Sequence, residues 1–385
     1  MSKDKRYDIA IVGMMLSSHG GGMPRSMAQQ AKMMSDAGHK VTLYIGNSKK
    51  MPFTPDQFYL NDSIKIYVGN SIGFWGFGIV PKTTWLLFKN ASNHDVIHLN
   101  GVWNFMTFFG SIISFLKKTP AIISCRSHYG DYHFTRKPIL KRILFYTLEI
   151  INLKLAYALH VTANWENQTS WRATRRANHI IKIPNPTDLT DFENPLPREK
   201  CRNILNLNQN GFYIIHLGRT AKQKNLSILI KSIKYLESKR DIHLILAGPP
   251  EKHEKKKLLD LCEQLNIREK ITFIDLVEGK DRGKWLAAAD IFTLPSHDDN
   301  FCIVAIEAAA SGTLSIVSPF VGAVEYLPKS MIKICENNQN DWNNIIENYY
   351  NNRPVQKVMS DEVKKQFLNE TIEQQWIKQY EIMSV

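Results

Sequence analysis

The sequence predicts an α/β protein of two doubly wound domains, each a parallel sheet with helices on both faces. Short apolar runs alternate with helical patterns along all 385 residues, which is typical of such sheets. A proline-rich stretch over residues 184–200 interrupts the alternation, and a new strand–glycine–helix unit starts near residue 212. We therefore expect one domain over residues 1–190 and a second over residues 200–365.

Nine apolar runs are expected to form the buried strands. They are residues 9–15, 41–45, 96–99 and 121–124 in the first domain, and 213–217, 243–247, 271–274, 291–294 and 314–317 in the second. Apolar residues at helical spacing predict a helix across the asparagine-rich segment 336–352. A last helix, within residues 370–385, carries Trp376 and Tyr380, which can close the core of either domain by packing back on the first or covering the second.

Charge is unevenly distributed along the chain. Lys and Arg number 49 against 36 Asp and Glu, a net charge of +13. Up to Thr190 there are 23 basic and 10 acidic residues, and the remainder has 26 of each. All of the net charge lies in the first half, which indicates an anionic partner there: nucleic acid, anionic lipid or a phosphorylated substrate.

Cysteine usage and hydropathy bear on the compartment. Five cysteines, an odd number without a CxxC pair, suit a reducing cytoplasm. The apolar run near the N-terminus leads into a glycine loop, so it predicts a buried strand and not a signal peptide. No run reaches the roughly 18 apolar residues of a membrane span, which predicts a soluble or surface-bound protein. Histidines and cysteines do not cluster with ligand spacing, so we expect neither a metal nor a cofactor.

Two loops after predicted strands are candidates for binding an anionic ligand. The first, residues 19–22, contains Gly21 and Gly22 before a helix, so a ligand can approach its backbone; an ordinary strand-to-helix turn is the alternative. The second loop begins with Gly218 and places Arg219 and Lys224 at the carboxyl end of a strand. Two cations there suit a diphosphate, and a solvated basic loop is the alternative.

The segment 294–312 is the most informative. A strand ends at Pro295, residues 298–300 can cap a helix over residues 301–311, and Gly312 ends it. That helix is apolar or small on all sides except for Glu307, so we expect a buried carboxylate. A ligand hydroxyl, or an internal Arg or Lys, would satisfy it, and we favour the ligand. For Asp299 the alternative to ligand contact is a helix cap.

These residues carry a family resemblance. Gly218-Arg219 with Lys224, and the acidic pair Asp299 and Glu307 with seven residues between them, resemble the retaining glycosyltransferases of family 4, the glycosyltransferase group 1 type. The segments 38–41, 95–98, 183–185 and 289–296 also resemble that family, in the same order, so the resemblance spans nearly the whole chain.

The resemblance implies the GT-B architecture: two Rossmann-like domains that face across a cleft. The second would bind a UDP- or GDP-sugar donor, and the first a glycan or lipid-diphosphate-linked acceptor. Arg219 and Lys224 would neutralise the leaving diphosphate, while Glu307 would bind ribose and Asp299 the sugar hydroxyls. The backbone near the donor would comprise Gly21, Gly22, Gly218, Phe301, Cys302 and Ile303. The expected activity is retaining hexosyl transfer in cell-surface polysaccharide biosynthesis.

The chain departs from the family pattern in four places. Asp299 stands where the family usually has a longer Glu, and Cys302 where a glycine is common. Asn225 and Pro186 also replace common glycines. These departures leave the identity of the donor sugar open.

The first domain offers four candidates for catalytic or acceptor contacts. Arg126 and His128 follow the predicted strand 121–124, His98 ends another, and Glu166 lies at a similar strand end. The alternatives are surface loop positions for the first two and a core histidine for His98.

Basic residues of the first domain lie beside bulky apolar ones, as at Phe115-Leu116-Lys117-Lys118 and Trp171-Arg172. This mixture favours an anionic membrane surface, with the protein peripheral on its cytoplasmic face. A solvated charged face is the alternative. A nucleic-acid-binding protein is an alternative of a different class. The sequence shows no recognisable reading helix, RNP pattern or zinc knuckle to support it. Another sugar-nucleotide enzyme, such as an epimerase, is a third alternative.

Overall fold

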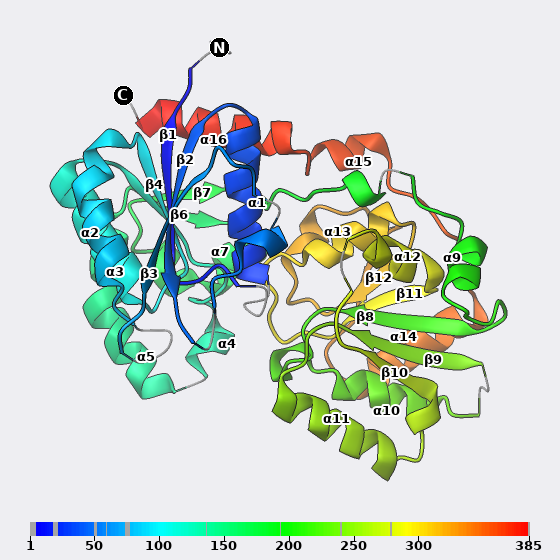
Figure 1. Ribbon diagram of the computed structural model, residues 1–385. Coiled ribbons are helices and arrows are strands. Elements are labelled where there is room, and N and C mark those ends of the chain that lie inside the picture. The colour runs from blue at the N-terminus through cyan, green and yellow to red at the C-terminus, as the bar shows by residue number, and fades with distance from the viewer. Residues whose placement is uncertain are drawn as a thin grey trace. The chain divides into compact units, whose positions relative to one another are not determined.

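The computed structural model describes residues 5–17, 22–49, 52–58, 60–73, 78–135, 137–192, 194–238, 241–277 and 279–383. The chain divides into two compact units (Figure 1). Unit 1 comprises Met1–Thr187 and Phe367–Val385, and unit 2 comprises Asp188–Gln366. Unit 1 contains 24 basic and 12 acidic residues against 25 and 24 in unit 2, so the excess positive charge belongs to unit 1.

The sheet of unit 1 has seven strands in the order β3-β2-β1-β4-β5-β6-β7, all paired in parallel. The strands are β1 (Asp8–Gly13), β2 (Lys40–Asn47), β3 (Lys65–Asn70), β4 (Val96–Asn100), β5 (Ala121–Ser124), β6 (Ala158–Val161) and β7 (His179–Lys182). The strand order reverses between β1 and β4, as in a doubly wound fold.

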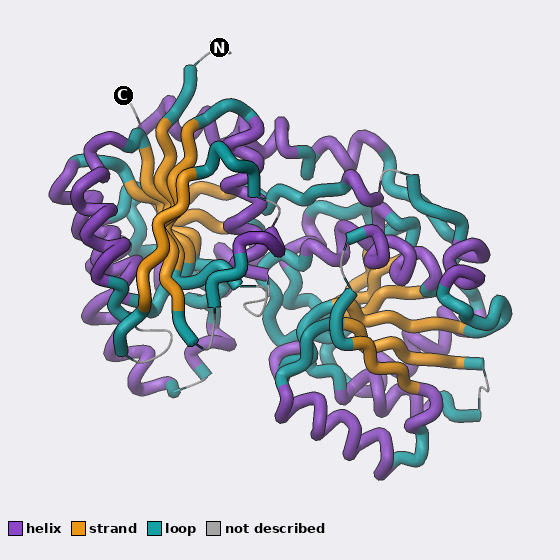
Figure 2. The backbone as a smooth tube through the Cα atoms, viewed as in Figure 1, coloured by secondary structure: helices purple, strands orange, loops and turns teal. Residues whose placement is uncertain are grey.

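Helices cover both faces of this sheet (Figures 1 and 2). They are α1 (Gly22–Asp36), α2 (Pro81–Asn90), α3 (Phe105–Lys117), α4 (Asp131–Phe134), α5 (Pro138–Leu144), α6 (Ile150–Leu155), α7 (Asn164–Thr169), α8 (Trp171–Thr174) and α16 (Asn369–Met383). Alternate residues of β1 enter two different cores: Ala10 packs with α2 and α3, and Ile9 with α1 and α16. Two buried faces explain why the strands are apolar throughout.

The C-terminal helix α16 belongs to unit 1. Its Trp376 and Tyr380 are almost fully buried in the core that contains Ile9. The Trp376 ring packs edge-on against His98 and His160, each at 4.8 Å between ring centroids. The helix therefore closes the core of the first unit although the second unit precedes it in the sequence.

Unit 2 has a six-stranded parallel sheet in the order β10-β9-β8-β11-β12-β13. Its strands are β8 (Phe212–Leu217), β9 (Ile242–Ala247), β10 (Ile271–Ile274), β11 (Ile291–Leu294), β12 (Leu314–Val317) and β13 (Ile332–Ile334). Its helices are α9 (Arg198–Ile204), α10 (Ser227–Tyr235), α11 (Lys252–Gln264), α12 (Lys280–Ala288), α13 (Ile303–Ala310), α14 (Gln339–Asn351) and α15 (Asp361–Lys365). In Figure 1, α10, α11 and α14 lie on one face of the sheet, and α9, α12 and α13 on the other.

All nine predicted strands are present, together with four that apolar runs did not mark: β3, β6, β7 and β13. The strands β3, β7 and β13 lie at sheet edges, and their side chains are partly exposed. The strand β6, between β5 and β7, is short and contains His160, which interrupts its apolar run. The helix across the asparagine-rich segment is confirmed as α14, with Trp342 and Ile346 buried.

Candidate functional site

In unit 2, the predicted ligand-binding residues gather in loops at the carboxyl ends of β8 and β11. These two strands are neighbours in the sheet, and the strand order reverses between them. In open α/β sheets, ligands bind at this reversal, because the loops on either side of it diverge. One loop runs from Gly218 to α10, and the other from Pro295 to α13.

Hydrogen bonds tie these two loops together. The side-chain amide of Gln223 donates to the carbonyl of Asp298 at 2.6 Å, and the amide of His297 donates to the carbonyl of Gln223 at 2.9 Å. The hydroxyl of Ser296 donates to the carbonyl of Asp298 at 2.8 Å. The loops therefore form one preorganised structure, although about 75 residues of chain separate them.

An ion pair between Lys224 and Asp299 joins the same loops. Both side chains are only 15% exposed. Arg219, on the same loop as Lys224, pairs with Glu251 at 3.3 Å, and both of these side chains are well exposed. The structure thus pairs one predicted cation with the predicted sugar-binding acid, and the other with an acid that sequence reasoning missed. An exposed pair such as Arg219–Glu251 contributes little stability and opens readily for a ligand.

The start of α13 differs from the prediction. The helix begins at Ile303, and Cys302 occupies its N-cap position without a side-chain capping bond. The helix cap, which was the alternative for Asp299, is therefore absent, and the backbone of Asp299 instead bridges in parallel to Val321. The donor-side residues Phe301, Cys302 and Ile303 do lie at the helix N-terminus, where the helix dipole favours anions.

Backbone geometry explains two departures from the family pattern. Cys302 has φ of 62° and Asn225 has φ of 52°, both in the left-handed region that glycine adopts most easily. Asparagine tolerates this region, whereas cysteine is strained in it. The positions at which the family prefers glycine thus keep a glycine-like backbone in this chain. Burial also raises the pKa of the Cys302 thiol well above its ordinary value, so this cysteine is not a ready nucleophile.

Glu307 is buried, as predicted, and it has a protein partner. Arg282 of α12 forms an ion pair with its carboxylate, and the two side chains are 12% and 8% exposed. The internal salt bridge, which was the less favoured alternative, is therefore present. A ligand hydroxyl would then share the carboxylate of Glu307 with Arg282. The sequence did not indicate this arginine as the partner of Glu307, because the two residues are 25 positions apart.

A neutral histidine lies beneath the Gly218 loop. His216 is almost fully buried in β8, and burial lowers its pKa to about 4. Its Nδ1 therefore donates to the carbonyl of Thr293 at 3.1 Å. A Cβ at Gly218 would lie 3.3 Å from Nε2 of this ring, which explains why a glycine opens the loop.

In unit 1, Arg126, Glu166 and His98 lie inside the protein. The guanidinium of Arg126 donates to Oδ1 of Asn185 and, at 3.0 Å, to Oδ1 of Asn100. Glu166 accepts hydrogen bonds from four donors of residues 125, 127 and 162, at distances between 2.6 and 3.2 Å. It thereby holds the loop after β5, where Arg126 and Ser127 both have positive φ.

His98 has the core role that was its alternative. Its ring is fully buried and bonded to Gln30 at 3.2 Å and to the hydroxyl of Tyr380 at 2.7 Å. Burial, and secondarily the charge of Arg126, lower its pKa to about 3. With both ring nitrogens engaged, His98 cannot contact an acceptor, so that prediction is wrong. Glu166, 1% exposed and fully engaged, is likewise a structural residue.

His128 is the unit 1 candidate with access to solvent. It is half-buried after β5, and its ring packs edge-on against His133 at 4.8 Å. Its carbonyl accepts a hydrogen bond from the indole of Trp103 at 2.9 Å. Of the first glycine loop, Gly22 begins α1 and is exposed, while Gly21 lies outside the described residues.

Residues 197–366 match the family model described as Glycosyl transferases group 1. The match covers 170 of the 385 residues, so this part of the chain is similar to the group 1 glycosyltransferases. An uncharacterized glycosyltransferase of Methanocaldococcus jannaschii is 34% identical over 114 residues, which are 30% of this chain and 29% of that protein. A D-inositol 3-phosphate glycosyltransferase of Arthrobacter is 26% identical over 179 residues, 45% of this chain and 42% of that protein. The chain thus spans less than half the length of these curated relatives.

Solved structures confirm the GT-B fold of the chain. HepE from Anabaena, solved in complex with UDP and glucose, superimposes with a TM-score of 0.78 at 19% identity. The superposition covers 99% of this chain and all of HepE. Both units therefore have the predicted Rossmann-like architecture.

Gly248 directly follows β9 of unit 2, beside the Gly218 loop, and was not singled out from the sequence. Its φ is 137°, and a Cβ there would lie 2.2 Å from the carbonyl oxygen of Gly218. We expect Gly248→Ala to destabilise the protein by about 2–4 kcal/mol, because both the contact and the backbone must change. Urea unfolding measures this loss. Gly283→Ala, within α12, is the matched control, since its Cβ would lie at an ordinary contact distance of 3.5 Å from Asp191 and Phe192. Equal midpoints for the two variants would contradict the prediction.

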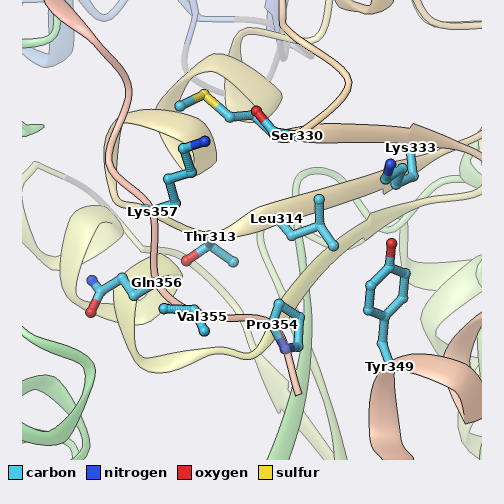
Figure 3. Close-up of a pocket in the computed structure, with 11 residues that line it drawn as sticks. Thr313, Leu314, Ser330, Lys333, Tyr349, Pro354, Val355, Gln356 and Lys357 are labelled. Atoms are coloured by element: carbon cyan, nitrogen blue, oxygen red, sulfur yellow. The ribbon is translucent and has the colours of Figure 1, made fainter. Parts of the chain in front are cut away.

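A cavity of about 410 Å³ lies elsewhere in unit 2 (Figure 3). It is lined by Leu314 at the start of β12, Lys333 of β13, Tyr349 of α14 and the segment 354–357. Because β12 begins at Leu314, the cavity is at the amino end of the strand, and none of the predicted donor residues lines it. It is therefore distinct from the candidate donor site.

In the part of the chain that the structure describes, no group of three or more His, Cys, Asp or Glu side chains has the arrangement of a metal site. Within the same residues, no helix has both the length and the apolar character to cross a bilayer.

Proposed function

We propose that this chain is a retaining glycosyltransferase that transfers a hexosyl group from a UDP- or GDP-sugar to a glycan or lipid-linked glycan. The observation that carries the proposal is the loop pair at the carboxyl ends of β8 and β11, which combines Lys224, Asp299 and the N-terminus of α13. A cation and a helix N-terminus suit a diphosphate, and a carboxylate suits sugar hydroxyls. HepE, which has the same fold, is described in complex with UDP-glucose.

In this proposal the protein supplies charge and position. Arg219 and Lys224 stabilise the diphosphate as the bond to the sugar breaks, and no metal or other cofactor is needed to neutralise it. Asp299 holds the sugar hydroxyls, with the amides of Cys302 and Ile303 nearby, and Glu307 holds the ribose while Arg282 orients its carboxylate. The leaving phosphate takes the proton of the acceptor hydroxyl on the same face of the sugar, so the anomeric configuration is retained.

The acceptor side is assigned to unit 1. We propose that His128 contacts the acceptor, since it is the candidate there with solvent access. The net positive charge of unit 1 supports an acceptor linked to a lipid diphosphate and an anionic membrane surface, with the protein peripheral on the cytoplasmic side. Cell-surface polysaccharide biosynthesis fits such an acceptor.

Thermal-shift measurements with UDP, GDP, ADP and a short oligonucleotide test the donor assignment. A single nucleoside diphosphate should raise the melting temperature, because a ligand that binds only the folded state stabilises it. Stabilisation by the oligonucleotide alone would instead indicate a nucleic-acid-binding protein. Product analysis by NMR with the matching nucleotide sugar then separates transfer with retention from epimerisation, which would change the sugar while it remains on the nucleotide.

Co-sedimentation with vesicles of anionic lipid at low salt tests the surface assignment. We expect binding that weakens as salt is added, since the exposed charges of unit 1 are screened. Absence of binding at low salt would remove the membrane from the proposal and leave the donor assignment intact.

A further inference from the structure

Helix α5 of unit 1 is unusual because none of its side chains is buried. It nevertheless carries three large apolar residues that are exposed to solvent: Ile139 at 75%, Leu140 at 45% and Ile143 at 56%. A short helix normally turns such residues toward a core. Figure 1 shows α5 at the periphery of unit 1, beside α4. Leu144, at the end of α5, packs partly buried against the core of unit 1, whereas the side of α5 with Ile139, Leu140 and Ile143 is exposed.

The apolar surface continues beyond α5. The π-helical turn that follows, Phe145–Glu149, exposes 54% of Tyr146, and Trp171 of α8 is 38% exposed. The guanidinium of Arg176 lies over the Tyr146 ring, 5.5 Å from its centroid, which brings α8 next to this turn. Single exposed apolar residues are common on protein surfaces, but a contiguous group indicates a binding surface. We call this group, Ile139, Leu140, Ile143, Tyr146 and Trp171, the α5 face.

The charges around the α5 face are mostly positive. Residues 131–187 contain nine Lys and Arg and three acids, Asp131, Glu149 and Glu166. Glu149 and Glu166 are buried, at 2% and 1% exposure, and the exposed Asp131 forms an ion pair with Arg172. Arg142 and Arg175 are exposed, and Arg175 lies 5.5 Å from the centroid of the Trp171 ring. Aromatic and aliphatic side chains surrounded by cations match the acyl–headgroup boundary of an anionic bilayer.

We propose that α5 inserts its apolar side into the headgroup region of an anionic membrane, and that Arg142 of α5 and Arg175, which directly follows α8, bind the lipid phosphates. The inference deepens the proposed lipid-linked acceptor and rests on it. It goes beyond charge attraction, because it names the inserted helix. A second copy of the chain or an acidic protein would be the other occupants of such a surface. The excess of cations over acids in residues 131–187, nine against three, argues against a second copy, which would bring a second set of the same cations.

Vesicle binding of single variants of the full chain tests the insertion. Ile143→Glu should lower the affinity for vesicles that contain phosphatidylglycerol by at least about tenfold, because a charge replaces buried hydrocarbon. The matched control is Ile204→Glu in unit 2, an isoleucine of α9 with 52% exposure and the same change in net charge. We expect it to bind within about twofold of the unaltered protein. Because α5 buries no side chain, both variants should keep their melting temperatures.

A depth measurement separates insertion from surface attraction. Ile143→Trp should add fluorescence that is quenched by lipids brominated on the acyl chain, and Ile204→Trp should not. Equal vesicle affinities for the two glutamate variants, or the absence of acyl-chain quenching, would overturn the proposal. So would sedimentation velocity that shows a dimer which only Ile143→Glu dissociates. Vesicle binding, fluorescence quenching and sedimentation do not depend on catalytic turnover. A failure of the membrane proposal would therefore leave the assignment of the donor site untouched.

Discussion

Replacing Lys224 by alanine is expected to lower kcat for sugar transfer by about 10²–10³-fold, as for the loss of one preorganised charge at a developing anion. The nearby Asp299 would make the loss larger in practice. Without Lys224 the carboxylate of Asp299, only 15% exposed, has lost its ion-pair partner and repels the diphosphate. The measurement is the initial rate of nucleoside diphosphate release from the nucleotide sugar whose diphosphate stabilises the protein.

The control for this variant lies on the same loop. Lys222→Ala removes the same charge two residues away, from an exposed side chain. We expect it to leave kcat within about twofold of the unaltered protein, since an exposed charge acts through screened, long-range interactions only. If the two variants have equal rates, Lys224 serves the ion pair with Asp299 and not the reaction. A melting temperature measured for each variant separates loss of folding from loss of catalysis.

The sequence predicted those features of the site that depend on local order along the chain. Apolar strands followed by polar loops predicted that Gly218, Lys224 and Asp299 would lie at the carboxyl ends of the strands. In a parallel sheet these ends are all on the same side. An all-round apolar helix predicted the burial of Glu307. These inferences need only the spacing of apolar residues along the chain and the chemistry of single residues.

Partners distant in sequence were not predictable in the same way. Arg282 is one of several basic residues on α12 and its surroundings, and nothing in its spacing marks it as the partner of Glu307. The roles of His98 and Glu166 were misjudged because a strand end can place a side chain either in the interior or in the ligand site. Tyr380, which engages His98, is 282 residues away. The choice between core and site is made by tertiary packing, which a single sequence does not display.

Asp290 shows how a residue of a family motif can serve the fold. It directly precedes β11 and is 1% exposed. Its carboxylate accepts hydrogen bonds from the guanidinium of Arg202 at 2.8 Å and from the backbone amide of Tyr213 at 2.7 Å. Arg198 completes the cluster at 3.3 Å. One acid thus joins α9 to the starts of β8 and β11, the two strands whose opposite ends carry the candidate donor loops.

We expect Asp290→Ala to destabilise the protein by about 3–5 kcal/mol, because it leaves the 3% exposed guanidinium of Arg202 buried without its counter-charge. Urea unfolding followed by far-UV circular dichroism measures the loss. The control is Asp275→Ala, which breaks an exposed pair with Lys255 and should lower the stability by less than about 1 kcal/mol. Asp290→Asn keeps an acceptor for the Tyr213 amide but removes the charge, so its loss should fall between these two. A small loss for Asp290→Ala would mean that water reaches Arg202 once the carboxylate is gone, and that the strand starts hold their positions through packing alone.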